Sequence, residues 1–184
     1  MLKKTSLVID HLIDHDLDIL ALTETWHYAD DTKTIGDMSI AGYNFHHVPR
    51  GSRGGGVAIL IRSSLPAKVN SIFEARSFES IHVTIQAKSI CLQVVTIYRV
   101  PPSTKNKIKS WEFLPEFTEY LEQLAPLKGK LLIAGDINIK WNLLHDPERK
   151  SFADILDTNN LIQHVSALIP THDKGNTIDM IISR

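Results

Sequence analysis

The sequence has a single cysteine, no long apolar run and no excess of charge of either sign. One cysteine, Cys91, excludes an internal disulfide framework, and its place in an apolar run predicts a buried thiol. No stretch approaches the ~20 apolar residues that a transmembrane helix needs. The lysines near the N-terminus are not followed by an apolar core of signal-peptide length. These absences predict a protein that has no membrane contact, is not secreted and works inside the cell, in the nucleus or the cytoplasm.

The formal net charge is −1, with 20 basic against 21 acidic residues. A net charge this close to zero gives no overall positive electrostatic potential of the kind that indicates a nucleic-acid partner. A local basic rim would still serve an enzyme that holds a polyanionic substrate briefly.

The length of 184 residues and the 43% hydrophobic content suffice for one domain with a substantial core. No internal repeat, low-complexity tract or linker divides the chain, so residues 1–184 are predicted to form one domain. Helical and strand-like patterns alternate, which is typical of an α/β fold with layered sheets. The predicted helices cover residues 5–16, 111–124 and 151–160, the last capped by Ser151, and the predicted strands cover residues 17–22, 57–61, 78–85, 89–98, 131–134, 161–165 and 177–182.

A carboxylate and an amide follow the apolar strand at residues 131–134. Asp136 and Asn138 are two residues apart, and such side chains point to the same side of an extended chain. A carboxylate can take a proton from water or hold a cation, and an amide can donate to a phosphoryl or carbonyl oxygen. Gly-Asp-x-Asn is also typical of a turn, so the four residues alone leave both interpretations open.

Three other strands carry a polar side chain at or near an end. Glu24 follows residues 17–22, although a lone glutamate there also fits the solvated start of a loop. Tyr98 precedes Pro101-Pro102, and a half-buried tyrosine with a hydrated hydroxyl is the alternative. Asp179 lies among apolar residues, where a buried charge is costly, so we expect it to have a cationic or hydrogen-bonding partner.

The glycine-rich segment at residues 50–56 lacks the Gly-Lys-Ser/Thr and the following helix of a phosphate loop. It predicts a flexible turn that leads into a central strand, with Arg50 and Arg53 free to meet an anion. The adjacent His46 and His47 fall in a predicted loop without partner spacing and do not indicate a metal site. Three lysines at residues 105–109 are typical of a solvated face and could also contact a polyanion.

Five motifs occur in order along the chain. They are Thr23-Glu24-Thr25-Trp26, Gly54-Gly55-Gly56-Val57-Ala58, a tyrosine before two prolines (Tyr98 to Pro102), Gly135-Asp136-Ile137-Asn138, and Thr171 followed by Ile178-Asp179. Together they resemble the endonuclease/exonuclease/phosphatase superfamily, the fold of DNase I and the abasic-site endonucleases. The closest likeness is to the endonuclease domain of LINE-type (non-LTR) retrotransposon proteins, which is associated with a reverse transcriptase. Ile137 replaces the usual phenylalanine, and the resemblance covers nearly the whole chain.

The resemblance implies a four-layered α/β sandwich of two mixed β-sheets flanked by helices, and hydrolysis of DNA phosphodiesters with Mg²⁺ or Mn²⁺. It implies that Glu24 is the metal ligand, since a hard oxygen donor suits these ions. Asp136 would align or deprotonate the attacking water, and Asn138 would hold the scissile phosphate. Tyr98 would steady that phosphate as charge develops.

The resemblance also implies roles for two further residues. Thr171 occupies the position of a threonine near the DNA backbone, and Asp179 that of the acid that hydrogen-bonds a catalytic histidine. The family places an Asn-bearing strand before the first helix and a Ser-Asp-His on a last strand, whereas this chain begins at the helix and ends at Ser183-Arg184. None of its nine histidines takes the place of the missing one.

These departures predict a fold that is truncated at both ends and a nuclease that is impaired as the chain stands. The alternative is an inactive remnant that acts at most as a binding module. A second alternative is a phosphomonoesterase of the same fold that acts on lipid or nucleotide phosphates. The sequence indicates no protein partner.

Overall fold

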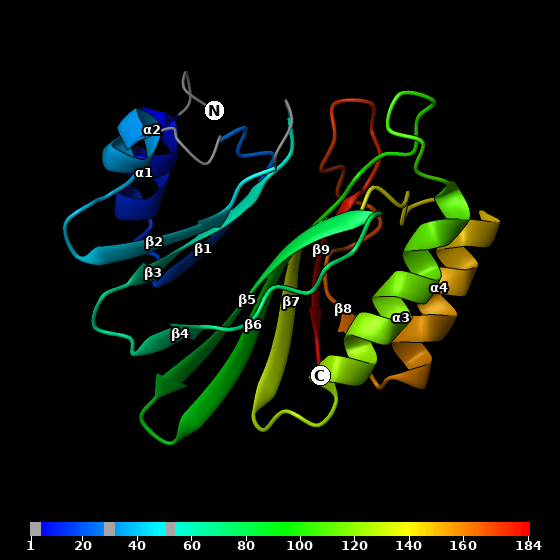
Figure 1. The fold of residues 1–184 in the computed structure, drawn as a ribbon. Helices are drawn as coiled ribbons and strands as arrows, with labels where there is room; N and C mark the ends of the chain where they lie inside the picture. The colour runs from blue at the N-terminus through cyan, green and yellow to red at the C-terminus, as the bar shows by residue number, and fades with distance from the viewer. Residues whose placement is uncertain (1–4, 28–31, 51–53) are drawn as a thin grey trace.

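Two β-sheets pack face to face between two layers of helix in the computed structural model, which describes residues 5–27, 32–50 and 54–184 (Figure 1). The helices are α1 (Thr5–Asp14), α2 (Thr32–Asp37), the 3-10 turn η1 (Ser110–Glu112), α3 (Phe113–Leu124) and α4 (Pro147–Thr158). The strands are β1 (Ile19–Thr23), β2 (Tyr43–Val48), β3 (Val57–Arg62), β4 (Ala67–Val69), β5 (Phe78–Ala87), β6 (Ile90–Arg99), β7 (Lys130–Asp136), β8 (Ile162–Gln163) and β9 (Asp179–Ser183). The predicted four-layered α/β sandwich is confirmed.

The large sheet has the strand order β4-β5-β6-β7-β9-β8 and is mixed. Strands β6 and β7 run parallel, which requires the crossover connection that α3 supplies. Helix α3 buries Phe113, Phe117, Leu121 and Leu124, a spacing that lines one face of a helix. This face packs with α4 against one side of the large sheet and forms the largest part of the core (Figure 1).

The small sheet has the order β1-β3-β2, with antiparallel pairing among its described strands. Its middle strand, β3, is apolar on both faces, as expected for a strand that is covered on both sides. Val57, Ile59 and Ile61 pack against the large sheet, while Leu60 packs with Leu12 of α1 on the opposite side. The prediction that the glycine-rich segment leads into a central strand is therefore confirmed.

The start of α4 differs from the prediction. The helix begins at Pro147 rather than after Ser151, and its N-cap is Asp146, which accepts a hydrogen bond of 3.0 Å from the backbone N–H of Arg149. Asp followed by Pro is a strong helix start because the carboxylate caps a free N–H and proline fits the first helical position. The prediction of a Ser151 cap was wrong.

Two further expectations were wrong. His46 and His47 lie in β2, paired with Ile59 and Ala58, and not in a loop. Cys91 is only half-buried, because it lies near the start of β6 where the strand leaves the covered part of the sheet. Among the described helices none is long and apolar enough to cross a bilayer.

Candidate active site

Three of the predicted site residues form a row across the large sheet. The strand register pairs Tyr98 of β6 with Asp136 of β7, and Asp136 with Asp179 of β9. Side chains at paired positions of neighbouring strands lie about 5 Å apart on the same face. Tyr98 is 4% exposed and packs in the core between the two sheets, so the row faces the small sheet.

Glu24 reaches this row from the small sheet, just beyond the end of β1. Its carboxylate lies close enough to the Tyr98 hydroxyl to help raise the pKa of that group, and it accepts hydrogen bonds from the Trp26 indole and, at 3.3 Å, from the backbone N–H of Gly55. Glu24 and Trp26 both have positive φ, at 53° and 56°. Non-glycine residues in this conformation cost energy and cluster at functional sites. Four predicted residues from two different sheets therefore meet in one place.

The glycines of the second motif, Gly54 to Gly56, fix the position of Glu24. Backbone hydrogen bonds join Thr25 to Gly56 at 3.2 Å and Trp26 to Gly55 at 2.8 Å, and they extend the pairing of β1 with β3. Gly56 has a φ of 86°, and a Cβ on it would lie 2.5 Å from the hydroxyl of Thr25. Only glycine permits this close approach, so the segment acts as a support for the Glu24 backbone and not as a phosphate cradle.

Asp136 and Asn138 are brought together by a turn, not by an extended chain as the sequence suggested. Asn138 has a φ of 52°, its backbone N–H donates to Asp136 Oδ1 at 2.9 Å, and its Nδ2 donates to the Arg99 carbonyl at 2.9 Å. Ile137 between them is fully buried in the core, which explains why an apolar residue stands there. The turn and the site are thus the same structure, and both open interpretations of the motif apply.

The carboxylates of the row are poorly compensated. Burial, together with the nearby charges of Asp179 and Glu24, raises the pKa of Asp136 to about 7. Burial and the Glu24 carboxylate also raise the pKa of Tyr98, so its hydroxyl stays protonated and can donate. Repulsion between these carboxylates favours the binding of either a proton or a cation.

Thr171 and Asp179 are close neighbours, but their contacts differ from the expectation. The Thr171 hydroxyl accepts hydrogen bonds of 3.0 Å from the backbone N–H groups of Ile178 and Asp179 and so fixes the start of β9. The Asp179 carboxylate makes no ion pair or hydrogen bond with the part of the chain that the structure describes. The partner expected for it is missing, because Asp179 opens its strand and is only half-buried, so that water reaches it.

Arg50 lies beside the row, while Arg53 lies outside the described residues. The Arg50 guanidinium is 5.5 Å from the centre of the Tyr98 ring and is bonded through Nε to the Glu79 carboxylate. Glu79 is paired with Tyr98 in the register and also accepts a hydrogen bond of 2.5 Å from Gly56 N–H. Arg50 is therefore held in place, not free as the sequence suggested.

The donor set suits a divalent cation that is only partly bound by protein. No group of three or more His, Cys, Asp or Glu side chains arranged to enclose a metal ion occurs within residues 5–27, 32–50 and 54–184. Mg²⁺ commonly binds through one or two carboxylates and completes its shell with water and substrate phosphates. Glu24, supported by the nearby Asp136 and Asp179 charges, fits that arrangement.

Arg99 and Glu148 also support the site, and sequence reasoning did not find them. Arg99 is 2% exposed; its Nη2 lies 2.5 Å from Glu148 at the start of α4, and its guanidinium stacks on Phe113. Its carbonyl holds the Asn138 amide, so the ion pair ties the Asn138 turn to the helical layer. The only signal in the sequence was the alternation of side chains along a strand. Because Arg99 follows Tyr98 in the same strand, its side chain must lie on the opposite face of the sheet.

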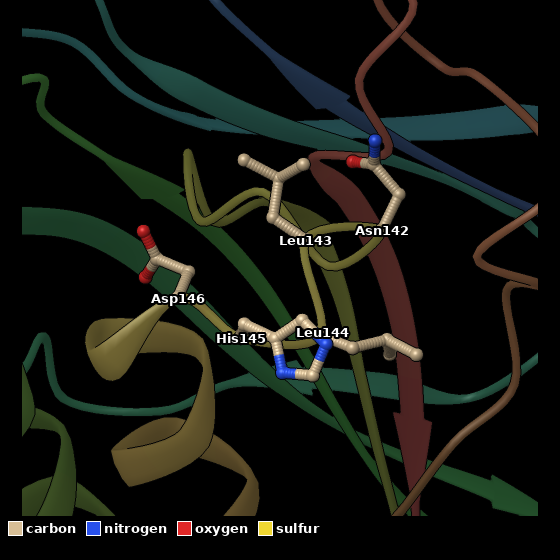
Figure 2. Close-up of a pocket in the computed structure, with 5 residues that line it drawn as sticks. All are labelled: Asn142, Leu143, Leu144, His145 and Asp146. Atoms are coloured by element: carbon tan, nitrogen blue, oxygen red, sulfur yellow. The ribbon is translucent and has the colours of Figure 1, made fainter.

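A hollow of about 500 Å³ lies farther along the chain, lined by residues 142–146, between β7 and α4 (Figure 2). Its Leu143 and Leu144 side chains are 43% and 56% exposed. None of the predicted site residues lines it, so the hollow is separate from the row.

The contribution of Asp136 to the thermal stability of the metal-free protein should fall as pH rises. Folded Asp136 keeps its proton up to a pKa of about 7, whereas the unfolded side chain loses it near pH 4, so the stabilisation present at low pH is lost as pH rises through 7. Between pH 5.5 and 8.5 this amounts to ~2 kcal/mol, or a Tm lower by ~4–8 °C.

Calorimetry of wild type and Asp136→Asn in a chelating buffer would measure this effect. The buried His47 and His82 have lowered pKa values and act in the opposite sense, but they are common to both proteins. The difference between the two Tm curves isolates Asp136, and parallel curves would contradict the prediction.

Comparisons with known proteins agree with this geometry. Residues 1–184 match the model of the Endonuclease/Exonuclease/phosphatase family. The TRAS1 endonuclease domain, from a telomere-specific non-LTR retrotransposon, superposes with a TM-score of 0.71 at 14% identity, over 97% of this chain and 78% of that one. The human Nocturnin catalytic domain gives 0.68 at 18% identity, over 98% and 74%.

A third structure is the Neisseria 3′ phosphatase NExo bound to a product DNA hairpin, with a TM-score of 0.67 at 20% identity, over 98% of this chain and 81% of that one. No curated protein sequence matches the chain. The family match spans the whole sequence, and the structural matches share the fold that brings Glu24 to the row. The chain therefore belongs to the endonuclease/exonuclease/phosphatase family, whose members hydrolyse phosphodiesters or phosphate esters.

Proposed function

We propose that residues 1–184 act as one domain that hydrolyses DNA phosphodiesters with Mg²⁺ or Mn²⁺, as the nicking endonuclease of a LINE-type element. The observation that carries this proposal is the meeting of Glu24 from the small sheet with Tyr98, Asp136 and Asp179 of the large sheet. The likeness to the TRAS1 endonuclease domain supports the same substrate. We propose that it acts inside the cell, in the nucleus or the cytoplasm.

Each side chain of the site has a role in hydrolysis by water. One oxygen of Asp136 is held by the Asn138 N–H, which leaves the other to orient a water molecule and accept its proton. The water oxygen forms a bond to phosphorus as the bond to the sugar oxygen breaks, and the leaving oxygen takes a proton from solvent. The Tyr98 hydroxyl and the second N–H of the Asn138 amide donate to the phosphate oxygens as their charge grows.

The divalent ion, when bound at Glu24, would supply Lewis-acid stabilisation of the phosphate charge. Thr171 contributes by holding the first residue of β9, and hence Asp179, in line with Asp136. Because the row contains no histidine, we propose a rate ~10²–10³-fold below that of a family member with its full set of donors.

Nicking of supercoiled plasmid tests the proposal. We expect conversion to the open circle in Mg²⁺, and no conversion in excess chelator. In Glu24→Gln, half-maximal nicking should require at least ~10-fold more Mg²⁺, since a neutral amide is a weaker ligand than a carboxylate. Nicking that ignores both chelator and substitution would come from a contaminant, and intact plasmid at high Mg²⁺ would favour the inactive binding module.

A phosphomonoesterase is the second candidate, and its support is the similarity to the 3′ phosphatase NExo. The same row of residues would serve, because a terminal phosphate is attacked by water in the same way as a diester. This candidate predicts release of inorganic phosphate from a 3′-phosphorylated oligonucleotide, a nucleotide or a phosphorylated inositol, without any strand cleavage. A paired assay on plasmid and on these monoesters separates the two.

A further inference from the structure

A second, basic pocket adjoins the row on the β5 side. It has a volume of about 290 Å³ and is lined by Arg50, Arg76, Glu79, Val100, Asn106 and Ile108, among other residues. Arg50 and Glu79 are also the neighbours of Tyr98, so the pocket begins where the row ends. Sequence reasoning connected Arg50 to an anion but did not connect it to this pocket.

Arg50 is built into the wall of the pocket. Its Nε is anchored by Glu79, its guanidinium lies over the Tyr98 ring, and a Cβ on Gly55 would overlap it. Its Nη2 is buried and finds no hydrogen-bond acceptor among the described residues. A buried donor without an acceptor is unfavourable, so an arginine held in this way is pre-organised for an anion.

The opposite wall is a loop that is rigidly folded. Asn106 accepts hydrogen bonds of 3.0 Å from the backbone N–H groups of Ser103 and Ile108 and donates to the Pro101 carbonyl at 2.9 Å. This network gives the segment after Tyr98 one shape and fixes where its lysines leave the chain. All three lysines of the loop, Lys105, Lys107 and Lys109, are exposed.

The charges around the pocket are predominantly positive. Arg50 is paired with Glu79, and Arg76 lies 3.4 Å from Glu112 while remaining 69% exposed. Each nearby acid also accepts a backbone N–H: Glu79 from Gly56, Glu112 from Lys109, and Glu116 from Arg76 and Ser77. The three loop lysines form no ion pair within the described ranges. The lining of the pocket therefore carries two arginines against one acid, Glu79, although the whole chain carries a net charge of −1.

We propose that this pocket binds a phosphate of the DNA strand two to three nucleotides away from the bond that is cleaved. From Asp136 to Glu79 is two strand spacings, or ~10 Å, and the pocket continues beyond Glu79 to Arg76, so the separation exceeds what one phosphate group can span. Such a second contact favours a polynucleotide over a small phosphate ester. The inference rests on the proposed nuclease function, because it takes the row as the place of cleavage.

Binding of a fluorescein-labelled 14-base-pair DNA duplex, followed by anisotropy in metal-free buffer at several salt concentrations, tests the pocket without any cleavage. Arg76→Gln should weaken binding ~3–10-fold at low salt and reduce the salt slope by about 1, because one phosphate contact is lost. Lys68→Gln is the matched control, since it removes one exposed charge from β4, away from the row, and should leave both values unchanged. A Tm within 2 °C of wild type confirms that each variant is folded.

Equal affinities and salt slopes for Arg76→Gln and Lys68→Gln would overturn the proposal, as would a wild-type protein that does not bind the duplex. Hydrolysis of the small diester bis(p-nitrophenyl) phosphate in Mg²⁺ measures the cleavage reaction independently of DNA binding at the pocket. If the duplex binds through Arg76 but no ester is hydrolysed, the proposed nuclease function fails while the pocket stands. If esters are hydrolysed but Arg76→Gln binds like wild type, only the pocket fails.

Discussion

Asp136→Asn will lower the rate of plasmid nicking ~10³-fold and will at the same time raise the Tm at pH 8. The rate falls because an amide cannot accept the proton of the attacking water, a function worth ~10²–10⁴ in rate. The fold is kept because the amide oxygen can still accept the 2.9 Å hydrogen bond from the Asn138 N–H. The Tm rises because a neutral side chain avoids the cost of burying a charge, the main cause of the raised pKa of Asp136, and also relieves the repulsion from Asp179 and Glu24.

The opposite signs of the two effects make the experiment informative. Loss of nicking together with a lower Tm would mean that Asp136 is a structural residue, contrary to the proposed role. Asp154→Asn is the matched control, because it makes the same chemical change on the exposed face of α4. It should leave both the nicking rate and the Tm unchanged. Nicking that survives Asp136→Asn at the wild-type rate would contradict the proposed mechanism.

The sequence could predict the row because its members interrupt apolar strands. Tyr98 and Asp136 end two buried strands that the crossover through α3 makes parallel neighbours, so their ends meet at one edge. The same reasoning could not show that Glu24 crosses from the other sheet. That contact depends on the packing of two sheets, which no local pattern encodes; the resemblance to a known family supplied it.

The missed elements and contacts have different physical causes. Strand β2 was missed because its two histidines and Asn44 obscure the alternation of Tyr43 and Phe45, and its pairing with β3 outweighs this weak local preference. The Arg99–Glu148 pair joins residues 49 positions apart and is visible only after α4 has docked. Arginine is rarely buried, so an exposed Arg99 was the expectation. No signal in the sequence was strong enough to outweigh it.

The strand predicted at residues 131–134 stops before Gly135, whereas the structure places Gly135 inside β7, where it permits a close approach to β6. It is paired with Ile97, has a φ of 149°, and a Cβ on it would overlap the Ile97 carbonyl oxygen. Gly135→Ala must therefore separate the two parallel strands next to Asp136, and we expect it to cost at least ~3 kcal/mol of unfolding free energy. Urea denaturation followed by tryptophan fluorescence would measure this loss.

Gly36→Ala gives the comparison that isolates the clash. Gly36 lies in α2, and a Cβ on it would have no atom within 4 Å, so the same substitution should change the unfolding free energy by less than ~1 kcal/mol, in the stabilising direction. If Gly135→Ala and Gly36→Ala have similar urea midpoints, β6 and β7 do not approach as closely as described. In that case the register that aligns Tyr98 with Asp136 is wrong as well, because Gly135 and Ile97 are the adjoining pair of the same ladder.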